Sequence, residues 1–229
     1  MPNDNLHKRR NDERQRRKTD IKNQRKGTWL IVTEGEKTEP NYFEEAIKDF
    51  NNGLNEDEKI KLDIMGQGMN TLSLVKSAEE FVYEVDKYRN KTPIYSKVFV
   101  AFDKDSFDDT LFDEAIKFCE NQGWIPLWSN EAFELWFMLH FNYNDAALSR
   151  NLYKEKIEEY FKTSGLKYKY KKNDKDIYSL LKQYGSLEKA IERARKLHLE
   201  EHKNDKPSES NCCTTVYKFF EDLDETKKY

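Results

Sequence analysis

Short apolar runs that are rich in β-branched and aromatic residues recur along the chain, and segments with helical spacing separate them. The apolar runs cover residues 29–33, 60–65, 98–102 and 124–128, and the helical patterns cover 39–50, 71–88 and 111–120. Alternation of this kind indicates βαβ units, whose right-handed crossovers give a parallel sheet between helices. The sequence therefore predicts an α/β, Rossmann-like fold with a mostly parallel four-stranded sheet over residues 29–142.

The segment after the fourth apolar run has a different pattern. Residues 131–141 are apolar on nearly every side, which is typical of a buried helix. Residues 150–229 show only helical patterns, with an exposed, charged helix expected at 186–202 and a short amphipathic one at 214–223. We therefore expect residues 143–229 to form a helical extension that packs on the core.

The net charge of −3 over 229 residues is the sum of two different parts. Residues 1–28 contain ten Lys or Arg and four acids, a charge of +6, so the remainder carries −9. This N-terminal arm, flexible or helical, has no hydrophobic face to bury, and its basic residues suit the phosphate backbone of a nucleic acid. Arg9, Arg10, Arg16 and Arg17 are the candidate contacts, although a solvated tail would have the same composition.

A second basic segment, residues 167–172, interleaves tyrosines with lysines. Lys169 and Lys171 are candidate phosphate contacts, and Tyr168 and Tyr170 would suit stacking on single-stranded bases. A charged surface loop or edge strand fits the same residues equally well, so both interpretations stay open at this point.

Apolar runs and cysteines bear on the compartment. No apolar run approaches the length of a membrane span, and the N-terminus lacks the apolar stretch of a signal peptide. Cys119, Cys212 and Cys213 form no CxxC pair, which fits a reducing compartment better than a disulfide framework. We expect a cytoplasmic protein with no membrane partner.

Acidic residues follow the predicted strands where a catalytic crevice is expected, beyond the carboxyl ends of an open sheet. Glu34 follows the first strand, Asp103 and Asp105 follow the third, and Glu134 lies shortly after the fourth. If the first and third strands are neighbours, Glu34, Asp103 and Asp105 converge, and such carboxylates repel one another unless a cation lies among them. Oxygen ligands of this kind suit Mg²⁺ or Mn²⁺.

The same residues allow less specific interpretations. Acids at strand ends are common in a chain with 43 of them, and Asp105 could cap the helix that follows. Lys37 and Lys104 could contact substrate phosphate or could neutralise the acids beside them. His198 and His202 fit the H-x-x-E-H zinc pattern of some metalloproteases, but they lie in a strongly polar segment.

Two blocks carry a resemblance to a known domain. WLIVTEG, which ends at Gly35, and VFVAFDKD, which ends at Asp105, resemble the Toprim domain of type IA topoisomerases, primases and several nucleases. EGEKTEPNYF, SNEAFELWFMLHF and CTTVYKFFEDL, in this order, more narrowly resemble the RloB family of bacterial defence-associated proteins. The resemblance covers about residues 20–226.

The resemblance implies Mg²⁺-dependent phosphodiester chemistry. It makes Glu34 the general acid/base or a metal ligand, Asp103 and Asp105 metal ligands, and Glu134 a further acid near the metal. A topoisomerase would need a tyrosine-bearing gate domain for which the chain has no room, and primases of this class carry cysteine zinc modules. A nuclease is therefore the expected member of the class.

The related defence proteins favour RNA, such as tRNA, over DNA as the substrate. A DNA-directed nuclease and a non-catalytic nucleic-acid-binding or sensor subunit are the alternatives. An enzyme that is toxic to its host must also be restrained, so a regulatory defence-system protein or a second copy of the chain is a further expected partner.

Overall fold

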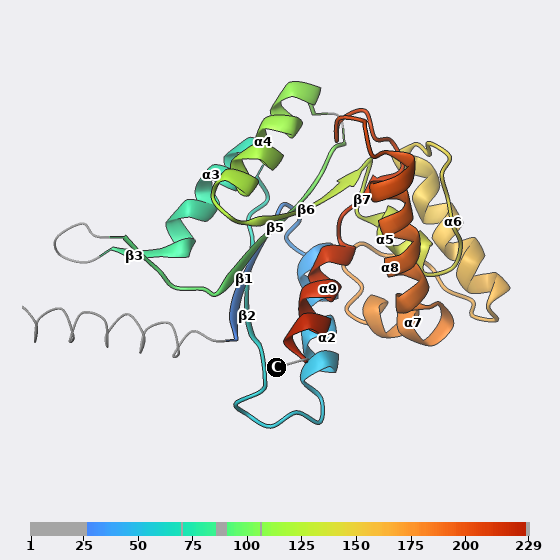
Figure 1. Cartoon of the computed structure of the whole chain (residues 1–229). Helices are drawn as coiled ribbons and strands as arrows, with labels where there is room; N and C mark the ends of the chain where they lie inside the picture. The colour runs from blue at the N-terminus through green and yellow to red at the C-terminus, as the bar shows by residue number, and fades with distance from the viewer. Residues whose placement is uncertain (1–26, 70, 86–90, 106, 228–229) are drawn as a thin grey trace, which may run out of the picture.

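The computed structural model describes residues 27–69, 71–85, 91–105 and 107–227, and its centre is a five-stranded sheet. The strands are β1 (Thr28–Thr33), β2 (Lys61–Gly66), β5 (Lys97–Asp103), β6 (Ile125–Asn130) and β7 (Cys213–Thr214). They lie in the order β2-β1-β5-β6-β7, and Figure 1 shows the sheet running through the middle of the molecule. The α/β class and the mostly parallel sheet are confirmed.

The prediction of four strands is wrong, because β7 adds a fifth. β1 pairs in parallel with β2 and β5, and β5 pairs in parallel with β6, whereas β7 runs antiparallel to β6. The hydroxyl groups of Ser129 on β6 and Thr214 on β7 are 2.9 Å apart. A strand of two residues has no measurable periodicity, so no sequence pattern could separate β7 from the helical segments around it.

The central strands are buried on both faces, which explains their continuous apolar runs. Trp29 and Ile31 of β1 belong to one hydrophobic cluster, and Leu30 and Val32 belong to the other. Helices α3 (Thr71–Val82) and α4 (Asp109–Asn121) cover one face of the sheet. Helices α2 (Thr38–Asn51) and α9 (Tyr217–Thr226) pack on the opposite face, as Figure 1 shows.

The helix predicted over residues 71–88 is shorter than its pattern suggested. It ends at Val82, and β3 (Tyr83–Val85) then pairs antiparallel with β4 (Lys91–Pro93) in a separate two-stranded sheet. The backbone N–H of Ile94 donates to the carbonyl oxygen of Val82, 2.9 Å away. Short runs with aromatic and β-branched residues fit either structure locally, and here the pairing between strands decides.

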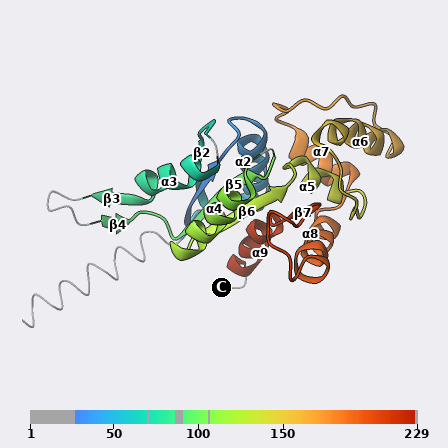
Figure 2. The ribbon, with the colours of Figure 1, turned by 90° about the horizontal axis from the view of Figure 1, so that it is seen from above.

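The extension, residues 143–229, contains α6 (Arg150–Thr163), α7 (Ile177–Tyr184), α8 (Leu187–Lys196), a π-helix (Leu197–Glu201), β7 and α9, and α5 (Glu134–Leu139) lies just before it. Figure 2 shows α6, α7 and α8 grouped at the opposite end of the sheet from the β3–β4 hairpin. The charged helix expected over 186–202 has a buried side made by Ala190, Ala194 and Leu197, and its last turn is π-helical. The extension shares the larger hydrophobic cluster with α2, so it is built into the fold.

His140 is buried against Trp136 of this cluster, and its pKa is lowered to about 3 by burial and by the charge of Arg193. The three cysteines are free and buried. Within the described ranges, no helix is both long enough and apolar enough to cross a membrane.

Candidate acidic site at the carboxyl edge of the sheet

A cavity of about 630 Å³ lies beyond the carboxyl ends of β1 and β5. Five acidic side chains and two lysines are part of its lining. They are Glu34, Glu36, Glu39, Asp103, Glu134, Lys37 and Lys172. The parallel pairing of β1 with β5 brings Glu34 and Asp103 to the same edge, as the sequence predicted.

Asp103 is the last residue of β5, and only 8% of its surface is exposed. Its backbone N–H donates to Oε2 of Glu34 at 3.2 Å, which joins the ends of the two strands. The pKa of the Asp103 carboxyl is raised well above its ordinary value, first by burial and then by the charges of Glu39, Glu134 and Glu34. Asp103 therefore lies within an acidic cluster that disfavours its ionised form.

Glu39 belongs to the first turn of α2 and is buried beneath the cavity. Burial and the charge of Glu134 raise the pKa of the Glu39 carboxyl. Hydrogen bonds from the backbone N–H groups of Glu39 and Gly35, together with the charge of Lys172, act in the opposite direction. The first turn of α2 thus contributes a carboxylate to the cavity, whereas the sequence pattern indicated only that a helix starts at Glu39.

Two glycines let the loops approach this closely. A Cβ atom on Gly35 would lie 2.1 Å from Oε2 of Glu39, so a side chain there would displace the carboxylate. Gly68 has a φ of +61°, and a Cβ atom on it would lie 2.9 Å from Oε1 of Glu36. The Gly66-Gln67-Gly68 segment is therefore a turn beside the cavity.

Glu134 begins α5 and is 5% exposed. The hydroxyl of Tyr170 donates to Oε1 of Glu134 at 2.8 Å. Burial and the nearby charge of Glu134 raise the pKa of Tyr170, so the phenol keeps its proton and remains a donor. The extension thereby fixes one oxygen of an acid that the core brings to the cavity.

Asp105 does not line the cavity, unlike the other three predicted acids. Its backbone has a φ of 40°, and its N–H donates to the carbonyl oxygen of Glu131 at 3.0 Å. The helix cap expected at this position is provided instead by Asp108, whose carboxylate accepts from the N–H groups of Thr110 and Leu111. Asp105 stays a predicted metal ligand.

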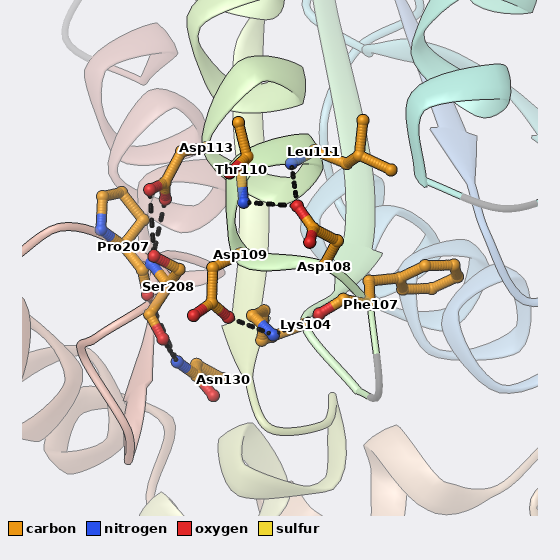
Figure 3. A network of polar contacts seen from close by, with 10 residues as sticks. All are labelled: Lys104, Phe107, Asp108, Asp109, Thr110, Leu111, Asp113, Asn130, Pro207 and Ser208. Carbon is orange, nitrogen blue, oxygen red and sulfur yellow. Dashed lines mark hydrogen bonds and ion pairs between the residues drawn. The ribbon is translucent and has the colours of Figure 1, made fainter.

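Lys104 does not line the cavity, and its side chain reaches Asp109 in the first turn of α4, as Figure 3 shows. Its Nζ lies 2.9 Å from Oδ1 of Asp109 and donates to the carbonyl oxygen of Phe107. Of the two interpretations of Lys104, the structure therefore supports charge neutralisation. Lys37, in contrast, lines the cavity and is exposed.

The structure describes only one of the two basic segments that were predicted to contact nucleic acid. Arg9, Arg10, Arg16 and Arg17 lie outside the described residues. Lys169 and Lys171 are exposed, which is compatible with phosphate contact. The stacking role is wrong for Tyr170, which is buried and donates to Glu134. Tyr168 is half-buried, and its hydroxyl donates to Oδ2 of Asp174 at 2.6 Å, so its stacking role stays a prediction.

The two histidines of the H-x-x-E-H pattern make separate contacts. Nδ1 of His198 lies 2.9 Å from the Tyr217 hydroxyl, and Nδ1 of His202 lies 2.8 Å from Oδ2 of Asp205. The π-helical turn between them also removes the α-helical spacing on which the zinc pattern depends.

Sequence reasoning missed three residues of the site: Glu39, Tyr170 as a partner of Glu134, and Lys172. Glu39 had a usable signal, since it belongs to the first turn of the helix that follows Glu34 and Gly35 at the carboxyl edge of the sheet. Lys172 had none, because no local pattern tells which lysine of a basic loop faces a cavity that lies far away in the sequence.

The donor set of the cavity consists of carboxylate oxygens, which suit a hard divalent ion. Across the described ranges, no three His, Cys, Asp or Glu side chains are already arranged as ligands of one ion. Burial, together with the charges of Glu39, Glu134 and Glu34, raises the pKa of Asp103, and a bound cation would offset this cost of ionisation. The residues therefore fit a divalent cation in their chemistry, and their side chains would turn toward it on binding.

The protein is therefore of the α/β class, with a mostly parallel sheet and an acidic cavity at the carboxyl edge of that sheet. The family model described as RloB-like protein matches residues 29–223, so the chain belongs to the RloB-like family. No curated protein and no solved structure matches the chain.

Proposed function

We propose that the protein is a metal-dependent nuclease of the Toprim type that hydrolyses phosphodiester bonds of nucleic acid. The observation that carries the proposal is the buried Asp103 carboxylate at the end of β5, with Glu34, Glu39 and Glu134 close enough to raise its pKa. Carboxylates at the ends of two adjacent parallel strands match the Glu-Gly and DxD blocks of the Toprim signature.

Asp103 and Glu134 are the residues best placed to hold Mg²⁺ or Mn²⁺, and Asp105 is a further predicted ligand. Such an ion lowers the pKa of bound water and stabilises a leaving oxygen. Tyr170 occupies one oxygen of Glu134, which leaves the other available to face the cavity. Burial of Asp103 excludes bulk water and so strengthens its attraction for a cation.

Glu34 is more accessible than Asp103 and lies on the adjacent strand end. It orients the attacking water and accepts its proton. Lys37 lines the same cavity and neutralises a phosphate oxygen of the substrate. In this proposal Glu34 as the general base, the acidic cluster and the Lys37 ammonium group surround a single scissile phosphate.

RNA such as tRNA is the proposed substrate, in the context of anti-phage defence, because the resemblance to defence-associated proteins makes arrest of translation a sensible outcome. This choice rests on family analogy and not on the cavity. The +6 charge of residues 1–28 supports a polyanionic substrate of either kind.

The test is a cleavage assay with full-length protein and labelled tRNA, single-stranded DNA and duplex DNA, each with Mg²⁺, Mn²⁺ or EDTA. We expect metal-dependent cleavage of RNA that EDTA abolishes. Glu34→Gln should reduce the rate by about 100-fold or more, because a general base typically contributes at least that much. Glu155→Gln, on the exposed side of α6, is the matched control and should cleave like the wild type.

Cleavage that survives EDTA, or that Glu34→Gln leaves unchanged, contradicts the proposed site. Cleavage of DNA alone would replace the RNA assignment. Binding of nucleic acid without cleavage under any metal condition would favour the non-catalytic binding or sensor subunit.

A further inference from the structure

The loop between α6 and α7 reaches across to the acidic cavity. We call residues 167–173 of this loop the strap. Two of its residues meet the site directly, since Lys172 lines the cavity and the Tyr170 hydroxyl donates to Glu134. The strap belongs to the helical extension, so the cavity is built from both parts of the chain.

The strap is held in place by the first turn of α2. The Thr38 hydroxyl donates to the carbonyl oxygen of Lys172 at 2.6 Å, and Nδ2 of Asn41 donates to that of Asn173 at 3.2 Å. Both hydrogen bonds fix the backbone at and beside Lys172. The backbone position from which the Lys172 side chain extends is therefore fixed by α2, the same helix that presents Glu39.

The strap is also fixed from the side of the extension. The backbone N–H of Tyr170 donates to Oε1 of Glu158 on α6 at 3.0 Å. Asp174 accepts from the Tyr168 hydroxyl at 2.6 Å and from the backbone N–H of Asp176 at 2.9 Å. With contacts on both sides, the strap is a positioned element that holds its lysine at the cavity.

Lys172 differs from Lys104, which lies at the same edge of the sheet. Lys104 is occupied by Asp109, whereas no carboxylate in the described part of the chain lies within ion-pair distance of the Lys172 ammonium group. Its neighbours Lys169 and Lys171 are exposed but do not line the cavity. Lys172 thus places a cation without an ion-pair partner beside the acidic cluster.

We propose that Lys172 binds a phosphate group of a nucleic-acid strand and so places the adjoining phosphodiester over the Asp103 cluster. This inference deepens the proposed function, on which it rests for the identity of the ligand. An ammonium group on a fixed backbone suits a phosphate oxygen, and one that faces carboxylates across the cavity also reduces their repulsion of the approaching strand. Lys37 lines the same cavity from the loop before α2, so the strand would pass between two cations.

The test is the affinity of the full chain for a fluorescent single-stranded RNA, measured in EDTA by anisotropy at several salt concentrations. EDTA removes divalent ions and separates binding from cleavage. Lys172→Gln should bind about tenfold more weakly, because it removes a charged hydrogen bond to phosphate. The slope of log affinity against log salt should fall in magnitude by about 0.7, the value for one phosphate contact on a single strand.

Lys175→Gln is the matched control, since it removes the same charge three residues away, outside the strap and outside the cavity lining. It should change affinity less than Lys172→Gln, and Lys172→Arg should restore most of the loss. Equal effects of Lys175→Gln and Lys172→Gln would overturn the inference, as would wild-type protein that binds no nucleic acid. A selective Lys172→Gln defect in a protein that never cleaves would support the inference while the nuclease proposal fails.

Discussion

Asp113 on α4 and Asp103 at the end of β5 have opposite surroundings, since hydrogen-bond donors face the first and other carboxylates face the second. Asp113 accepts hydrogen bonds from the backbone N–H and the hydroxyl of Ser208, at 3.0 and 2.9 Å (Figure 3). Asp103 instead lies among Glu34, Glu39 and Glu134, whose charges raise its pKa.

The comparison shows which acids serve the fold and which do not. A carboxylate with donors on both oxygens stabilises the loop that it joins. Buried carboxylates that face one another oppose folding unless a ligand balances them. In a chain with 43 acids, the acids that the fold leaves unbalanced are the candidates for function.

The largest expected difference between the two groups is in catalysis. Asp103→Asn keeps the shape of the side chain but removes its charge, so cleavage should fall by about 100-fold or more. Asp113→Asn should cleave at close to the wild-type rate in the same assay. Similar rates for the two variants would show that the comparison does not separate functional from structural acids.

The second difference is in stability. Asp113→Asn replaces a charged acceptor of two hydrogen bonds from Ser208, so we expect unfolding to be easier by about 2 kcal/mol. Urea unfolding followed by circular dichroism measures this loss. An Asp113→Asn protein as stable as the wild type would indicate that these hydrogen bonds contribute little.

Asp105 provides a further test of the comparison, because it belongs to the same DxD block as Asp103 but does not line the cavity. Its position predicts a smaller loss of cleavage for Asp105→Asn than for Asp103→Asn, less than about tenfold, which corresponds to about 1.4 kcal/mol. Single-turnover rates of the two variants decide this. Equal losses would place both residues of the DxD block at the reacting phosphate.

The alternation of strands and helices predicted the α/β class, and the positions of Glu34, Asp103 and Glu134 after strands predicted their meeting. Both follow from rules that act along the chain, namely burial on two faces and the geometry of parallel sheets. Glu39, Tyr170 and Lys172 were missed as site residues because tertiary contacts place them. The Thr38 and Asn41 hydrogen bonds to the strap join residues that are 134 and 132 positions apart.

The smallest expected effect is on stability without metal, where Asp103→Asn and Asp113→Asn should change the free energy of unfolding in opposite directions. The raised pKa of Asp103 means that the folded protein retains a proton that the unfolded chain releases, so stability decreases as pH rises above the ordinary value of 3.8. Asp103→Asn lacks this decrease and should be more stable than the wild type at pH 7 in EDTA. Unfolding curves at pH 5 and pH 7 measure the difference, and a less stable Asp103→Asn protein would argue against carboxylate repulsion in the cavity.

Direct measurement of metal binding tests the central claim, that the cavity acids hold a divalent ion. Mn²⁺ titrated into full-length protein can be followed by electron paramagnetic resonance without any substrate. The account predicts a Mn²⁺ site in the wild type and in Asp113→Asn that is lost or strongly weakened in Asp103→Asn. Equal Mn²⁺ binding by Asp103→Asn and the wild type, or no binding by the wild type, would contradict it.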